Sequence, residues 1–276
     1  MTFLSNLLFI GSLSLSPEMA ILFFIIALVG GFCITTIGPG GIFVTIALFA
    51  LLPLDPSTVA GTASATFIAT GIVGSMGYIR SGQLKTSAAI KGAIVLSLTS
   101  IIGAFIGSQI NTLLDVATFA ILLGLFVFFT GLLILYRQKN KLQAYKKLKM
   151  ETTKGLVLLG LVGVAVGLPG GLLGVGGPVL AVPFMVVLGV PMLLAVGLAQ
   201  VQSIFISAMA TFGYMLHDAV DWSLAIYLTI PLLIGTVAGW YMAQRIKVQK
   251  LQVALAIVLV IIGVYLMAGG ATPGTG

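Results

Sequence analysis

The sequence predicts an all-α polytopic membrane protein that is built from two inverted-topology repeats. All 13 Lys and Arg residues lie in three short polar gaps, 80–91, 137–154 and 245–250. The chain also matches itself after a shift of 136 residues, and the first apolar segment of each copy is interrupted by glycine. Because cationic loops stay on the cytoplasmic side of a membrane, the three gaps predict the orientation as well as the class.

The composition excludes a soluble domain. The chain is 59% hydrophobic and 7% charged, with a mean hydropathy of +1.23, whereas a soluble domain carries about 25% charged residues. The net charge of +7 therefore indicates the positive-inside bias of a protein in a lipid bilayer, and no nucleic-acid partner is expected. The single cysteine, Cys33, lies in an apolar run, so we expect a buried thiol and no internal disulfide.

An internal duplication explains the glycine pattern. Seven glycines of the first copy fall on glycines of the second, against about one expected by chance from 35 glycines in 276 residues. The matched pairs are Gly31 and Gly167, Gly38 and Gly174, Gly40 and Gly176, Gly41 and Gly177, Gly61 and Gly197, Gly77 and Gly213, and Gly103 and Gly239, and Tyr78 falls on Tyr214. The predicted parts are a lead-in 1–17, a first repeat 18–136, a basic loop 137–154, a second repeat 155–268 and a tail 269–276.

Each repeat contains four apolar segments. They are about 19–52, 57–79, 88–110 and 117–136, and then 155–190, 193–216, 222–243 and 251–268. A span needs about 20 residues, so the first segment of each repeat is too long for one straight span and too short for two. Glycine and proline weaken a helix, which predicts breaks at 37–41 in the first repeat and at 167–171 and 174–178 in the second. We expect a re-entrant-like hairpin at each, followed by three transmembrane helices.

The loops at equivalent positions of the two repeats carry opposite charge. The loop after the second segment is basic in the first repeat (80–91) but lacks Lys and Arg in the second (217–221), and the loop after the third segment shows the reverse (109–116 against 245–250). The prediction is a protein of the cell (plasma) membrane with both termini extracytoplasmic and the loop 137–154 cytoplasmic. The alternative treats each first segment as one full span. If the orientation of the first repeat is kept, this alternative places the basic loop 245–250 outside the cell, against the positive-inside rule, so it ranks second.

Inverted repeats with discontinuous helices are typical of secondary transporters, whose substrates bind near the membrane midplane. A helix break exposes backbone N–H groups, because the first four of any helix lack an internal partner, and this end of the helix dipole favours anions. The pairs Gly40–Gly41 and Gly176–Gly177 are related by the repeat. They predict two such helix ends at one central substrate site.

The polar residues near these breaks are uncharged. Every Lys, Arg, Asp and Glu can be placed at a helix end or in a loop, which disfavours a metal cation as substrate and favours an anion or a neutral solute. The candidate substrate-binding side chains are Thr35, Thr36, Ser64, Thr66, Gln200, Gln202 and Ser203, beside Gly40, Gly41, Gly176 and Gly177. In the alternative interpretation these groups bond neighbouring helices and the glycines only permit close packing.

Other chemistries have little support in the sequence. His217 lies beside Asp218 and Asp221, which is more typical of a solvated loop than of a metal or proton site. Neither a Walker A motif nor a Ser-His-Asp or zinc-protease pattern occurs, so we expect no enzyme activity, no metal and no cofactor. The sequence leaves open whether the protein forms a homo-oligomer.

The glycine-rich run 171–183 (GLLGVGGPVLAVP), with 195–197 and 213–222 after it, resembles the TauE/SafE family of membrane transporters, often called sulfite exporters. The resemblance covers nearly the whole chain. The first repeat departs more, with Gly38-Pro39-Gly40-Gly41 in place of a longer glycine run and Lys85-Thr86 in place of Asp-Trp.

The resemblance implies export of sulfite or small organosulfonate anions from the cytoplasm. Backbone N–H groups at the two glycine pairs suit a sulfur oxyanion, so the two lines of reasoning agree. Three rivals remain: a transporter of another small anion or a neutral solute such as a carboxylate, an anion channel, and a membrane subunit that transports nothing.

Overall fold

The described part of the chain is entirely helical. The computed structural model describes residues 15–139, 152–246 and 249–269, which form ten helices and no β-strand. The helices are α2 (Pro17–Thr36), α3 (Ile42–Leu51), α4 (Pro56–Arg80), α5 (Ser87–Asn111), α6 (Val116–Lys139), α7 (Thr153–Leu173), α8 (Pro178–Val187), α9 (Met192–Met215), α10 (Trp222–Ala243) and α11 (Gln249–Met267). Eight of them are apolar and long enough to cross a membrane, which confirms the predicted all-α polytopic class. Most of the lead-in, the middle of the basic loop and nearly all of the tail lie outside the described residues.

Short polar residues and prolines begin the helices. The side chains of Ser16 and Thr152 each accept a hydrogen bond from a backbone N–H in the first turn of α2 and α7. The two caps are related by the shift of 136 residues. Proline stands at the first position of α2, α4 and α8, where its missing N–H removes no helical bond.

The shift of 136 residues also relates the helices. It carries α3 onto α8 residue for residue, and it carries α2 and α4 onto α7 and α9 within one residue at each end. The matched tyrosines make matched contacts: the Tyr78 hydroxyl donates to the Thr35 carbonyl at 2.6 Å, and the Tyr214 hydroxyl donates to the Gly171 carbonyl at 2.7 Å. Each tyrosine thereby holds the end of the first helix in its own repeat.

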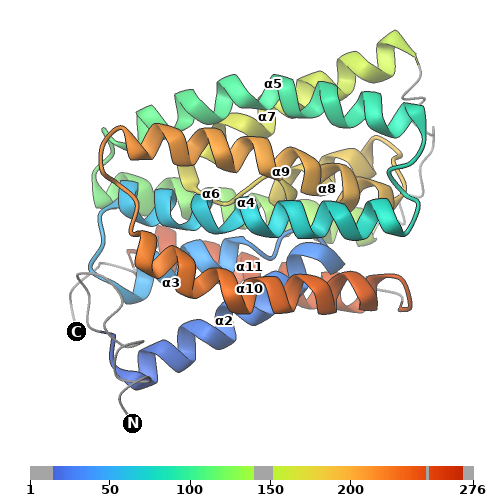
Figure 1. Ribbon diagram of the computed structural model, residues 1–276. Coiled ribbons are helices and arrows are strands. Elements are labelled where there is room, and N and C mark those ends of the chain that lie inside the picture. The colour runs from blue at the N-terminus through green and yellow to red at the C-terminus, as the bar shows by residue number, and fades with distance from the viewer. Residues whose placement is uncertain (1–14, 140–151, 247–248, 270–276) are drawn as a thin grey trace.

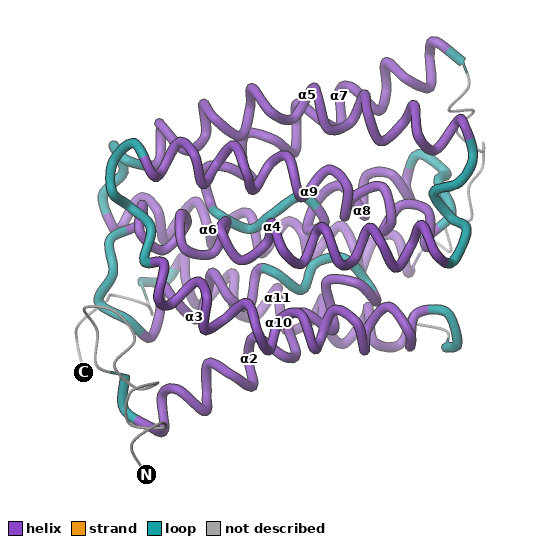
Figure 2. Tube along the Cα trace, in the orientation of Figure 1, coloured by secondary structure: helices purple, strands orange, loops and turns teal. Residues whose placement is uncertain are grey.

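Two breaks interrupt the first segments, at 37–41 and at 174–177. Gly38 (φ +105°) and Gly174 (φ +61°) are equivalent positions and both lie in the left-handed region, which glycine enters without a steric penalty. Figure 2 shows both breaks as loop segments in the interior of the bundle, surrounded by helices. Such backbone is tolerated within a membrane only where protein or a wet cavity surrounds it.

One predicted break was wrong. The helix α7 continues through 167–171 and ends at Leu173, with Pro169 inside it. The glycines there allow close packing, since a methyl group at Gly167 would lie 2.4 Å from the Ser100 carbonyl oxygen and one at Gly171 would lie 2.1 Å from that of Ala104. A proline inside a transmembrane helix is tolerated when neighbouring groups accommodate the lost bond.

The two arms of each interrupted segment differ in length. The first arms, α2 and α7, have 20 and 21 residues and could each span a membrane, while α3 and α8 have 10 residues each. In Figure 1, α3 turns back toward the end of the bundle at which α2 begins. Each first segment therefore forms a hairpin with one long arm and one short arm.

Each broken helix packs on a helix of the other repeat. The most extensive contacts join α2 to α10, α7 to α5, α6 to α11 and α4 to α9. Small residues permit these contacts: a methyl group at Gly235 would lie 2.1 Å from the Leu28 carbonyl oxygen, much as at Gly171 in the other pair. The repeats are thus interlocked, and large side chains such as Ile102 (68% exposed) cover the outer surface.

Charge separates the two ends of the bundle. At one end of the bundle lie the C-terminal ends of α4 and α10, which a hydrogen bond from Trp240 Nε1 to Ser81 Oγ (2.7 Å) connects. The described basic residues of the gaps 80–91 and 245–250 follow these helix ends. The other end holds the start of α10, where the Asp221 backbone N–H donates to Thr62 Oγ1 (3.0 Å). Figure 1 shows α2 beginning and α11 ending at this second end. The direction in which the bundle crosses the membrane stays a prediction.

We expect cysteine labelling to establish the orientation. Cys33 is buried, so the unmodified chain should react little with a membrane-impermeant maleimide. In intact cells Leu113→Cys, at an 84% exposed position between α5 and α6, should be labelled, whereas Gln244→Cys should be labelled only after permeabilisation. The reverse pattern would contradict the predicted orientation.

Candidate functional site

The two breaks lie against each other at the centre of the fold. A methyl group at Gly38 would lie 2.8 Å from the Val182 side chain of α8, and one at Gly41 would lie 3.3 Å from the Val175 carbonyl oxygen. A hydrogen bond from Thr45 Oγ1, in the first turn of α3 after the first break, to the Gly174 carbonyl (2.6 Å) ties α3 to the second break. Two segments that are 136 residues apart therefore form one local structure.

The short helices α3 and α8 both begin here. Gly41 and Gly177 occupy their N-cap positions, and no side chain caps either helix. In α3 the N–H groups of Phe43 and Val44 donate to the Gly40 and Gly41 carbonyls (3.2 and 3.0 Å), and Pro178 at the start of α8 has no N–H. The helix dipole gives each of these helix starts a partial positive charge. The junction thus brings together two uncapped helix N-termini from the two repeats.

The space between the breaks is too narrow to hold a water molecule. Nine residues line it: Ile34, Gly38, Gly41, Phe67, Thr70, Val175, Gly176, Pro178 and Ser203. Phe67 of α4 and Ser203 of α9 are equivalent residues of the two repeats, and both face Gly176. This conformation is closed at its centre, so a ligand enters only if the helices around the breaks separate.

Two predicted polar residues lie at this junction. Ser203 lines the space, with its Oγ 3.3 Å from a methyl group placed at Gly176. Gln202 lies beside Gly177: a methyl group placed at Gly177 would lie 3.4 Å from Gln202 Oε1. The Nε2 of Gln202 donates to Ser100 Oγ at 2.9 Å. The Oε1 of Gln202 is buried and accepts no hydrogen bond from the described residues.

Gln200 points elsewhere. Its Nε2 donates to the Ile34 carbonyl near the end of α2 at 3.1 Å, and its Oε1 lies against Gly74 of α4. That oxygen is also buried without a partner in the described chain. The two glutamine side chains therefore extend from different sides of α9, and the structure does not bring their amides together.

Three of the predicted hydroxyls already have partners. Thr35 Oγ1 donates to the Thr236 carbonyl (2.8 Å), Thr36 Oγ1 to the Phe32 carbonyl (2.5 Å) and Thr66 Oγ1 to the Ala63 carbonyl (2.7 Å). For these side chains the packing interpretation fits the contacts better than ligand binding. Ser64 is also buried, on α4.

The sequence reasoning missed several residues of the junction. Phe67 and Thr70 line the space, Thr45 ties α3 to the second break, and Ser100 holds the amide of Gln202. No local pattern distinguished the hydroxyls from those on other helices. The phenylalanine had a usable signal, since the repeat pairs it with Ser203 in the polar stripe of α9.

No charged side chain is buried in the described part of the protein. Its buried polar residues are all Ser, Thr, Asn or Gln. Among the same residues no cluster of three His, Cys, Asp or Glu side chains could hold a metal ion. The junction thus offers backbone N–H groups, hydroxyls and amides to a ligand, without a fixed charge of either sign.

Comparison with known proteins identifies the family. The family model described as sulfite exporter TauE/SafE matches residues 22–266, which include both breaks. The chain belongs to the TauE/SafE family. The TauE/SafE match runs from the first helix of the first repeat to the last helix of the second, so the protein is a multi-pass membrane transporter of this family.

Its relatives among curated proteins are distant and cover nearly the full length. A probable membrane transporter protein of Xylella fastidiosa (strain 9a5c) is 24% identical over 247 residues, covering 86% of this chain and 90% of the relative. The probable membrane transporter protein YunE of Bacillus subtilis (strain 168) is 25% identical over 273 residues, covering 90% and 98%. No solved structure matches this TauE/SafE chain.

Proposed function

We propose that this TauE/SafE protein is a secondary transporter that exports small sulfur-containing anions, sulfite or organosulfonates, through a site between the two breaks. One observation carries the proposal: the uncapped N-termini of α3 and α8 meet in a core whose described residues include no buried charge. The sulfur class comes from the description of the family model.

The chemistry of the junction favours an anion. Helix N-termini bind anions through their N–H groups and dipole, and two such ends act on one space here. A buried Asp or Glu would oppose an anion and a buried Lys or Arg would hold it too firmly to release, and the described core has neither. Ser203 adds a hydroxyl to the lining. The Gln202 amide, whose Nε2 bonds Ser100 and whose Oε1 faces Gly177, would donate to an anion after it turns about its last side-chain bond. Ser64 and Gln200 lie on the same two helices, α4 and α9.

The closed junction suggests how access alternates. Transporters with inverted repeats expose a central site to each side in turn by moving one body against another. Because α2 packs on α10 and α7 packs on α5, the moving bodies would each combine helices of both repeats. The contact between α4 and α9 then forms the sliding surface, and Phe67 and Ser203 face each other across it.

The membrane potential supplies a driving force for export. An inside-negative potential favours the exit of a monovalent anion by ~2.3 kcal/mol per 100 mV. With the predicted orientation, the anion would leave from the cytoplasmic side, where the basic loops lie, toward the end that carries Asp55 and Asp221. No further coupling ion is needed in principle.

Flux measured in proteoliposomes tests the proposal. Purified protein is reconstituted, the potential is clamped, and efflux of radiolabelled sulfite and of a small sulfonate is followed over a range of concentrations. Saturable flux of sulfur anions, competed by unlabelled sulfonate and weakly by a matched carboxylate, is the expected result. Equal competition by the carboxylate would assign a broader anion transporter, and unsaturable current would assign a channel.

A further inference from the structure

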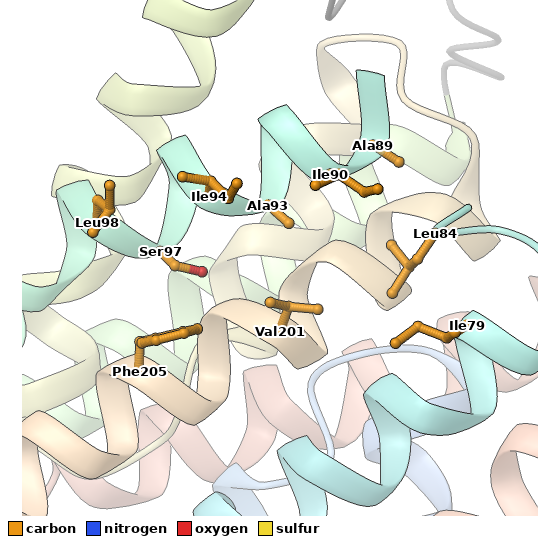
Figure 3. Close-up of a pocket in the computed structure, with 10 residues that line it drawn as sticks. All are labelled: Ile79, Leu84, Ala89, Ile90, Ala93, Ile94, Ser97, Leu98, Val201 and Phe205. Atoms are coloured by element: carbon orange, nitrogen blue, oxygen red, sulfur yellow. The ribbon is translucent and has the colours of Figure 1, made fainter. Parts of the chain in front are cut away.

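A deep apolar groove opens on the outer surface at the basic end of the bundle. It has a volume of about 410 Å³ and lies between the end of α4, the first half of α5 and α9. Figure 3 shows side chains from these three elements facing one another across it. The ten lining residues are Ile79, Leu84, Ala89, Ile90, Ala93, Ile94, Ser97, Leu98, Val201 and Phe205, and all but Ser97 are apolar.

The groove is about as long, measured along α5, as one lipid leaflet is thick. Its lining on α5 runs from Ala89 to Leu98, which is about 14 Å of helix at 1.5 Å per residue. Half of a bilayer's hydrocarbon core is about 15 Å thick. The groove therefore suits one extended hydrocarbon chain that enters from the membrane surface.

Three cations lie next in sequence to residues that line the groove. Arg80, Lys85 and Lys91 each follow directly a residue that lines the groove, and all three side chains are exposed. The sequence contains no acidic residue between Asp55 and Asp115, so no carboxylate from this stretch neutralises them. An apolar groove with a cationic rim is complementary to a molecule with an acyl chain and an anionic head.

We propose that this groove is a selective binding site for an anionic phospholipid of the cytoplasmic leaflet. One acyl chain occupies the groove between α5 and α9, and the phosphate lies among Arg80, Lys85 and Lys91. Lipid selection follows from this arrangement, since each basic residue near the surface adds attraction for an anionic headgroup.

The opposite end of the protein offers a matched control. A second apolar groove, of about 360 Å³, is lined by residues of α2, α3 and α11 that include Ile25, Ile46 and Ile262. The first basic residue of the chain is Arg80, so none of the residues from α2 and α3 brings a cation to it. This second groove should accept a hydrocarbon chain without preference for the charge of the head.

The lining of the groove is connected through side-chain contacts to the helices around the breaks. Leu84 lines the groove and packs against Gly197 of α9, which also contacts Tyr78. Tyr78 holds the Thr35 carbonyl at the end of α2. A lipid bound there should therefore raise the melting temperature of the purified protein as well as bind to it.

Native mass spectrometry of the full-length protein tests the site. The detergent-solubilised protein is titrated with phosphatidylglycerol and with phosphatidylcholine of the same chains. The expected result is at least about tenfold tighter binding of phosphatidylglycerol, weakened about fivefold for each charge removed in Lys85→Gln and Lys91→Gln. Ile94→Trp, which fills the groove, should remove the selective site, while Ile25→Trp in the second groove should leave the preference unchanged.

Several outcomes would overturn the proposal. They are equal binding of the two lipids by the unmodified protein, an unchanged preference in the Lys85→Gln/Lys91→Gln double variant, and a dimer whose formation is blocked by Ile94→Trp, since a second copy would then cover the groove. The two lysines are exposed, so the double variant should fold. An unchanged helix content, measured by circular dichroism, is the expected sign that it does.

Discussion

Gly174→Ala is expected to prevent stable folding of the protein. Gly174 has a φ of +61°, where an L-residue with a side chain pays roughly 1–2 kcal/mol. A methyl group there would also lie 2.4 Å from both the Cα and the carbonyl oxygen of Ala60, and this backbone cannot rotate away. The clash would separate α4 from the second break and disrupt the hydrogen bond from Thr45 to the Gly174 carbonyl.

Gly82→Ala is the matched control for backbone strain. Gly82 has a φ of +88°, and a methyl group there meets nothing within 4 Å. Gly82→Ala should therefore lose only the backbone strain of a side chain in the left-handed region, roughly 1–2 kcal/mol. The measurement is the fraction of monodisperse protein after solubilisation, with its melting temperature. Equal losses in the two variants would show that the contact with Ala60 is not decisive.

The architecture could be predicted because several independent patterns in the sequence agree on it. The glycine coincidences defined a shift of 136 residues, and that shift carries α3 onto α8 without an offset. Equivalent glycines at 38 and 174 take the left-handed conformation at which the chain turns. Length and hydropathy suffice for the spans, because every backbone group in a membrane must be satisfied within a helix.

The fate of individual glycines and prolines could not be predicted in the same way. The run 167–171 has the composition of a break but lies within α7, because its glycines meet the backbone of α5. Whether a glycine turns the chain or admits a neighbouring helix depends on a partner that is distant in sequence. For the same reason the hydrogen bond from Thr35 to the Thr236 carbonyl could not be predicted from the local sequence.

Helix geometry separates the two glutamines that the sequence placed in one group. Residues two apart on a helix are about 200° apart around its axis, so Gln200 and Gln202 face opposite sides of α9. The structure accordingly directs one amide to the end of α2 and the other to Ser100 beside the second break. Ser203, which lines the junction, lies between these two directions, about 60° around the helix from Gln200 and about 100° from Gln202.

Gln202→Glu is expected to suppress anion flux in a pH-dependent way, whereas Gln202→Ala should reduce it at every pH. In the proposed site the amide is a donor to the anion, and a hydrogen bond to a charged group is worth roughly 1.5–3 kcal/mol, or about 10- to 100-fold in apparent affinity. A carboxyl at this fully buried position is neutral when protonated and negatively charged when ionised. It would be protonated and tolerated at low pH, and ionised and repulsive to the anion at high pH.

The measurement is efflux of a small sulfonate, which stays ionised throughout, from proteoliposomes between pH 5 and pH 9, roughly the range in which buried carboxyls titrate. Thr130→Val is the control, since Thr130 Oγ1 bonds the Phe126 carbonyl within α6, whose main partner is α11. A Gln202→Glu flux that is independent of pH, from protein with unchanged melting temperature, would place the anion elsewhere. A flux lost at low pH and restored at high pH would indicate a cationic substrate, because an ionised carboxylate beside the helix ends of α3 and α8 attracts cations and repels anions.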